Sequence, residues 1–99
     1  MKNNSFLNLI NDYILKRNFE TANTLLRKQI IYTYMQKVQK YNKDYYYSTV
    51  TELLEELQKY SNNKDIQYHL FLYFYKIQNE DLLENDKTYK LLDIYENLQ

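Results

Sequence analysis

The chain has no glycine, proline or cysteine among its 99 residues, and this absence limits its fold more than any single motif does. Tight β-hairpins usually need glycine at positions of positive φ, so a β-rich fold is not expected. Glycine-rich phosphate loops, dinucleotide fingerprints and nucleophile elbows are excluded for the same reason. Without cysteine there is no disulfide, thiolate metal site or cysteine nucleophile. The sequence therefore predicts an all-helical protein.

The composition is that of a folded domain, because hydrophobic residues make up 44% of the chain and charged residues 26%. At this length we expect one domain over residues 1–99. Thirteen tyrosines and four phenylalanines predict a core that is aromatic as well as aliphatic. The sequence shows neither a run of about 20 apolar residues nor an apolar signal region near its start. We therefore expect a cytoplasmic protein that does not contact the membrane.

Apolar residues recur every three or four positions, which predicts a compact bundle of four to five antiparallel helices. The second helix, at about 19–41, is the longest and is expected to act as the scaffold of the bundle. Thr49 and Asp65 have the side chains of N-caps, and Asn18 is expected either to end the first helix or to cap the second. The helices are expected over residues 5–16, about 19–41, 50 to at least 57, 66 to about 78, and onward from a cap at Asn85 or Asp86.

The segment 70–75 is apolar on nearly every side, so its helix should be central in the bundle or form an oligomer contact. A strand is the competing interpretation of so short an apolar run. A bundle of about five helices cannot cover every face of such a helix, so some of its aromatic side chains should form an exposed patch that binds a partner. The candidate residues for this patch are Phe71, Tyr73, Phe74 and Tyr75. Residues 80–84 are ambiguous, and Leu82 with Leu83 could form a short extra turn.

The charges are unevenly distributed, although the net charge is zero. Residues 1–47 hold eight basic and three acidic residues, a net charge of +5, whereas residues 48–99 hold five basic and ten acidic residues, a net charge of −5. The two halves can attract each other within one bundle, or they can meet across an antiparallel homodimer or a basic partner. The first half could also form a local basic strip beside Tyr32 or Tyr41. The cations of this strip are Arg17, Arg27, Lys28, Lys37 and Lys40.

These cations are spread around the long helix and the net charge is zero, so nucleic acid is not an expected partner.

The sequence also offers few residues that could carry out catalysis. His69 is the single histidine, and it is expected to be a structural residue at the edge of the bundle. Glu52, Glu55 and Glu56 could bind a hard cation, but they lie opposite an apolar seam and are expected to form a solvated face. We therefore expect no catalytic residue, no metal and no cofactor.

The stretch LKRNFETANTLLRK, residues 15–28, resembles the opening of HEPN domains. These small helical bundles often have a short helix, an Asn-aromatic-Glu-x-Ala turn and a long helix that begins Ala-x-x-Leu-Leu-Arg. The helices expected at 49–57 and 91–95 fit the same order. Catalytic members of the family carry an arginine and, four to six residues later, a histidine as a ribonuclease site. In this chain Gln78-Asn79 stands at the arginine position, and Leu83, Glu84 or Asn85 stands where the histidine would be.

The resemblance therefore implies a degenerate, non-nucleolytic HEPN-like domain that is kept for dimerisation, regulation or partner binding. Our leading hypothesis is that this chain is a non-catalytic module that binds a protein partner of unknown identity. That partner could be a second copy of the same chain, which would make a homodimer. One alternative is a HEPN-type ribonuclease or toxin component with a non-standard polar site at His69, Gln78 and Asn79. Another alternative is a small phage- or plasmid-encoded inhibitor or immunity protein.

Overall fold

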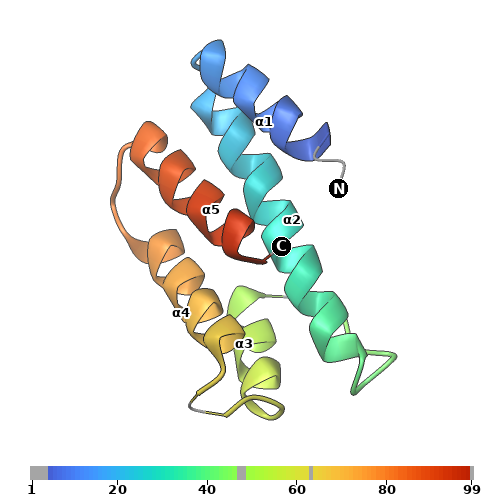
Figure 1. Cartoon of the computed structure of the whole chain (residues 1–99). Coiled ribbons are helices and arrows are strands. Elements are labelled where there is room, and N and C mark those ends of the chain that lie inside the picture. The colour runs from blue at the N-terminus through green and yellow to red at the C-terminus, as the bar shows by residue number, and fades with distance from the viewer. Residues whose placement is uncertain (1–4, 47–48, 63, 99) are drawn as a thin grey trace.

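The computed structural model describes residues 5–46, 49–62 and 64–98, and all of its regular structure in these ranges is helical (Figure 1). The all-helical prediction is therefore confirmed, and the strand interpretation of residues 70–75 is wrong. The radius of gyration of the Cα atoms is 13.9 Å, close to the ~13 Å of a compact chain of about 100 residues. The helices are α1 (Ser5–Leu15), α2 (Phe19–Gln39), α3 (Val50–Gln58), α4 (Ile66–Asn79) and α5 (Glu84–Leu98).

The turn between α1 and α2 depends on two polar residues. Arg17 has a positive φ of 58°, so it takes the left-handed conformation that often ends a helix. The side-chain oxygen of Asn18 accepts a hydrogen bond from the Thr21 backbone N–H at 3.3 Å and caps α2. Of the two roles expected for Asn18, the structure shows the N-cap of the second helix.

The core lies along one face of α2, whose fully buried apolar residues are Ala22, Leu26, Ile30, Tyr34 and Val38. This helix contacts α1, α3 and α5, and its contact with α5 is the most extensive between any two described helices. The Tyr34 ring also packs on Phe71 of α4, with ring centroids 4.4 Å apart. The most extensive contacts are therefore made by α2 and not by the apolar helix expected at 66–78.

Helix α4 instead lies at the side of the bundle against α3 and α5. It buries one stripe, made of Phe71, Phe74 and Ile77, while Tyr73 is 37% exposed. The reason is geometric, because a helix packed against neighbours on one side keeps its other side in water whatever its composition. The predicted N-caps of α3 and α4 are both confirmed: Thr49 accepts from the Glu52 backbone N–H, and Asp65 accepts from that of Gln67.

Helix α5 begins at Glu84, one residue before the earlier of the two caps that the sequence suggested. The Lys87 backbone N–H donates to the Leu83 carbonyl at 3.0 Å, which makes the first helical hydrogen bond. Residues 81–83 have no regular structure, so the short extra turn at Leu82–Leu83 is not formed. Glu84 is also hydrogen-bonded to Asn23 of α2. No helix within the described ranges has the length and apolarity needed to cross a membrane.

Candidate functional site

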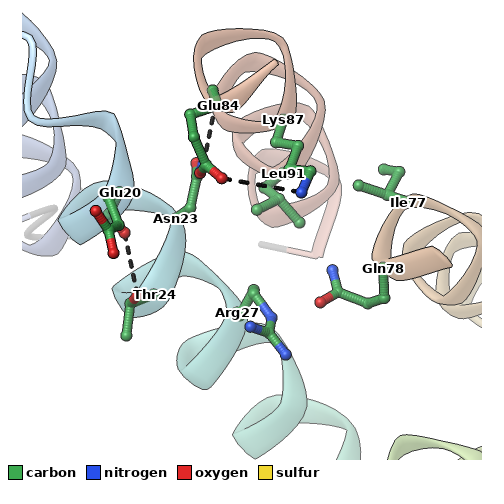
Figure 2. Close-up of a pocket in the computed structure, with 9 residues that line it drawn as sticks. All are labelled: Glu20, Asn23, Thr24, Arg27, Ile77, Gln78, Glu84, Lys87 and Leu91. Carbon is green, nitrogen blue, oxygen red and sulfur yellow. Dashed lines mark hydrogen bonds and ion pairs between the residues drawn. The ribbon is translucent and has the colours of Figure 1, made fainter. Parts of the chain in front are cut away.

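A polar cleft opens between α2, the end of α4 and the start of α5 (Figure 2). Its volume is about 340 Å³, within the range of roughly 300–1,000 Å³ that small-molecule pockets occupy. The core residues Ile77 and Leu91 form its apolar floor. The other residues that line this polar cleft are Glu20, Asn23, Thr24, Arg27, Gln78, Glu84 and Lys87.

A buried hydrogen-bond network fixes the wall of the cleft. The Asn23 side chain is 5% exposed, and its amide nitrogen donates to the Glu84 carbonyl at 3.0 Å and to the Glu84 carboxylate at 2.6 Å. The fully buried Thr88 hydroxyl contacts the Asn23 side-chain oxygen and the Glu84 carbonyl. Because buried polar groups are costly unless they are paired, this network holds the start of α5 in one position against α2.

Three hydrogen-bond donors face the open part of the polar cleft. Figure 2 shows the Lys87 ammonium, the Arg27 guanidinium and the Gln78 amide around the space between the three helices, with Glu20 at its far edge. The Lys87 ammonium lies 3.9 Å from the Glu84 carboxylate, a long ion pair. Arg27 and Gln78 form no hydrogen bond or ion pair with another residue in the described ranges. The cleft therefore combines a fixed wall with donors that have unused capacity.

A second, smaller pocket lies where the end of α2 meets the end of α3 and the start of α4. The rings of Tyr41 and Tyr60 stack beside it, with centroids 4.5 Å apart and planes within 7° of parallel. The Tyr60 hydroxyl donates to the Glu56 carboxylate at 3.3 Å, which orients its ring. We call this space the tyrosine pocket, and its lining is Lys37, Val38, Lys40, Tyr41, Leu57, Tyr60, Ser61, Asp65 and Gln67.

The polar groups at the tyrosine pocket are unequally satisfied. The Tyr34 hydroxyl donates to the Gln67 backbone carbonyl at 2.8 Å, and burial, with a contribution from the Asp65 carboxylate, raises the pKa of Tyr34 above its usual range. The side-chain oxygen of Gln67 is buried and has no hydrogen-bond partner within the described residues. A buried acceptor without a donor is unfavourable, so this oxygen lowers the stability of the fold at this position.

The structure does not bring the three residues of the expected polar site together. His69 and Gln78 are nine positions apart on α4, which corresponds to about 14 Å along the helix axis. The Asn79 amide donates to the Tyr75 carbonyl of its own helix at 2.9 Å. His69 is exposed, with its ring 5.7 Å from that of Tyr68. Of the three residues, only Gln78 lines the polar cleft.

The patch expected on the fourth helix is not present as a set. Phe71 and Phe74 are fully buried in the core and stack on each other at 5.6 Å, so they cannot contact a partner. They are three positions apart, and this spacing turns both toward the interior of the bundle. Tyr75 is half-buried. Tyr73 is exposed, with the Lys90 ammonium 5.8 Å from its ring centre.

The five cations of the expected basic strip lie in different places. Arg17 sits at the α1–α2 turn with its guanidinium 5.6 Å from the Phe19 ring centre. Arg27 lines the polar cleft, whereas Lys28 lies beside Tyr32 on another face of α2. Lys37 and Lys40 both line the tyrosine pocket. The strip is thus divided, because positions along one helix point in directions set by its 3.6-residue period.

The carboxylates of α3 have local partners. Glu56 pairs with Lys59 at 2.9 Å, and this hydrogen bond lowers the pKa of Glu56 and raises that of Lys59. Burial, followed by the charges of Glu56, Glu52 and Glu55, raises the pKa of Tyr45. Within the described ranges, no group of three or more acidic or histidine side chains is close enough to hold a metal ion.

The sequence analysis missed Asn23, Lys87 and Thr88 as members of a site. A signal for Asn23 was present, because it lies three positions before Leu26 and seven before Ile30 and thus shares their buried face. A polar residue within an apolar stripe must find a buried partner. The hydrogen-bond partner of Asn23 is Glu84 at the start of α5, which lies 61 residues further along the chain.

No family model matches this chain, and comparisons with curated proteins and with solved structures found no match. The functional conclusions below therefore depend on the geometry of the chain itself.

Proposed function

We propose that this protein is a non-catalytic module that binds a protein partner through the tyrosine pocket. The stacked pair Tyr41–Tyr60 carries the proposal, since Tyr41 is 67% exposed and Tyr60 36% exposed. Tyrosine is enriched among the residues that dominate binding energy at protein interfaces. A stacked pair presents its aromatic surface in one fixed orientation, so little conformational freedom is lost on binding.

The lining of the pocket indicates the chemistry of the partner. Val38 and Leu57 belong to the buried core and supply an apolar base. Lys37 and Lys40 place two cations at the same pocket, and Asp65 is engaged as the cap of α4. The complementary ligand is an acidic protein segment with one apolar anchor side chain.

The size of the pocket agrees with an anchor of this kind. Its volume of about 160 Å³ corresponds to about five water molecules of roughly 30 Å³ each. This is room for one side chain, whereas pockets for drug-sized molecules start at roughly 300 Å³. A second copy of this chain is one possible source of the acidic segment, because residues 48–99 carry a net charge of −5.

The proposal includes the finer architecture expected from the sequence. We take α2 as the scaffold of an antiparallel bundle, which is supported by its contacts with α1, α3 and α5. In that arrangement the end of α2 presents the tyrosine pocket, and the start of α2 presents the polar cleft. The HEPN-like resemblance fits the same role, since a degenerate member of that family is expected to regulate or bind a partner.

The test is binding of synthetic peptides in which one leucine or phenylalanine is flanked by glutamates, measured by fluorescence anisotropy. We expect binding to weaken at least tenfold in Tyr41→Ala, because truncation of a hot-spot residue at an interface costs about 2 kcal/mol or more. The matched control is Tyr32→Ala, which removes a 50% exposed tyrosine from another face of α2. It should bind as the wild type does.

Peptides with lysine in place of glutamate, or without the apolar anchor, should not bind. Equal weakening in the Tyr41 and Tyr32 variants, or no binding of any acidic peptide, would contradict the proposal. Sedimentation velocity at micromolar concentration tests the second copy as partner, since a homodimer that uses this pocket should dissociate in Tyr41→Ala but not in Tyr32→Ala.

A further inference from the structure

The polar cleft contains a set of donors that neither the interaction role nor the packing of the helices requires. Among the described residues that line it, the Arg27 guanidinium and the Gln78 amide have no hydrogen-bond or ion-pair partner, and Lys87 has only a contact of 3.9 Å with Glu84. These groups come from three different helices and face one space (Figure 2). Their convergence is therefore a tertiary feature.

Two carboxylates, Glu20 and Glu84, line the cleft together with the cations Arg27 and Lys87. Glu84 is bonded to the Asn23 amide at 2.6 Å, and this contact fixes its carboxylate against the wall. Glu20 lies at the far edge of the cleft, on the side away from Gln78. The Arg27 guanidinium and the Gln78 amide remain without a partner among the described residues, and the Lys87 ammonium has only the long contact with Glu84. An oxygen-bearing anion can accept hydrogen bonds from all three groups.

We propose that the polar cleft binds a small organic anion, whose carboxylate or phosphate group is held by Arg27 and Lys87. A guanidinium binds such oxyanions through two parallel N–H···O bonds, and these charge-assisted bonds are about twice as strong as neutral ones. Gln78 donates a further hydrogen bond through its amide. The neutral part of the ligand lies against the apolar floor of Ile77 and Leu91.

The wall and the volume of the cleft support a ligand of this class. The Asn23–Glu84–Thr88 network holds α2 and α5 together, so the backbone positions that carry Arg27 and Lys87 are fixed relative to each other before binding. A volume of about 340 Å³ exceeds that of about ten waters at roughly 30 Å³ each, so the ligand is larger than a bare phosphate ion. The cleft shares no residue with the tyrosine pocket, so this proposal stands apart from the proposed function.

The test is an NMR titration of the ¹⁵N-labelled chain with inorganic phosphate and, separately, with acetate, at constant ionic strength set by chloride. We expect saturable shifts of the Arg27 side-chain N–H, the Gln78 amide and the Lys87 backbone N–H. Saturation by phosphate alone would identify a phosphorylated ligand, saturation by acetate alone a carboxylate, and either result supports an oxyanion site.

The variant Arg27→Gln should weaken the binding by about tenfold, because one charge-assisted pair is lost. The variant Lys28→Gln is the matched control, since it removes the same charge at the next position of α2, outside the cleft. It should bind as the wild type does, and Lys87→Gln should weaken binding in the manner of Arg27→Gln. Linear shifts without saturation, or equal weakening in the Arg27 and Lys28 variants, would overturn the proposal.

Discussion

Replacement of Asn23 by alanine tests whether the contact between α2 and α5 depends on the buried network. The variant removes hydrogen bonds from the Asn23 amide to the Glu84 carbonyl and carboxylate, and one between Asn23 and the Thr88 hydroxyl. A bond to a charged group contributes about 1.5–3 kcal/mol and a neutral one about 0.5–1.5 kcal/mol. Part of this is recovered, since Glu84 is half-exposed to water and Thr88 keeps its bond to the Glu84 carbonyl. We expect a net loss of about 2–4 kcal/mol.

The free energy of unfolding, obtained from urea denaturation followed by far-UV circular dichroism, gives this loss directly if the slope with urea stays unchanged. Thr24→Ala is the matched control, because its exposed hydroxyl bonds only to the Glu20 carbonyl of its own helix, and we expect a loss under about 0.5 kcal/mol. A coupling of at least about 0.5 kcal/mol between Asn23→Ala and Thr88→Val should appear in a double-mutant cycle. A loss below about 0.5 kcal/mol for Asn23→Ala would refute the reasoning, because the pairing would then not be formed in solution.

Three other outcomes are expected. Leu53→Ala should cost about 2–5 kcal/mol in urea denaturation because Leu53 is fully buried, whereas Leu15→Ala, at an 81% exposed position, should cost under about 0.5 kcal/mol; equal losses would contradict the core assignment. Because the pKa of Tyr34 is raised on folding, its hydroxyl stays protonated in the folded chain at pH values where it ionises in the unfolded chain. The contribution of Tyr34 to the free energy of unfolding is therefore fully present below pH ~10. Above that pH it falls by up to about 1.4 kcal/mol per pH unit. Alkaline unfolding of Tyr34→Phe should show a smaller slope, and an identical slope would count against the assignment. Purified protein should not cleave RNA, since Gln78 lacks an ionisable proton and lies about 14 Å along α4 from His69; cleavage that disappears in His69→Ala would overturn the non-catalytic assignment.

The candidate sites were predictable only in part. The sequence analysis named Arg27 and Gln78 from different arguments. It placed Lys37 and Lys40 in one basic strip with Tyr41 beside it, but it did not expect these residues to line a pocket with Tyr60. It placed Phe71 and Phe74 in a surface patch, although both face the interior. A helix that is apolar on all sides does not show in its sequence which side its neighbours will cover. The periodic argument was therefore correct about the helix and wrong about which face is exposed.

What the sequence determined by itself was local. The absence of glycine and proline, the 3.6-residue period and the side chains of Thr49 and Asp65 were enough to give the helical class, most helix boundaries and two caps, while Asn18 was left with two alternative roles. Each of these depends on residues within about four positions of one another, because helical hydrogen bonds and caps have that range. The start of α5, the buried face of α4, the polar cleft and the tyrosine pocket were decided only by tertiary structure. They join residues such as Asn23 and Glu84, 61 positions apart, and no local pattern encodes which distant groups will meet when the core closes.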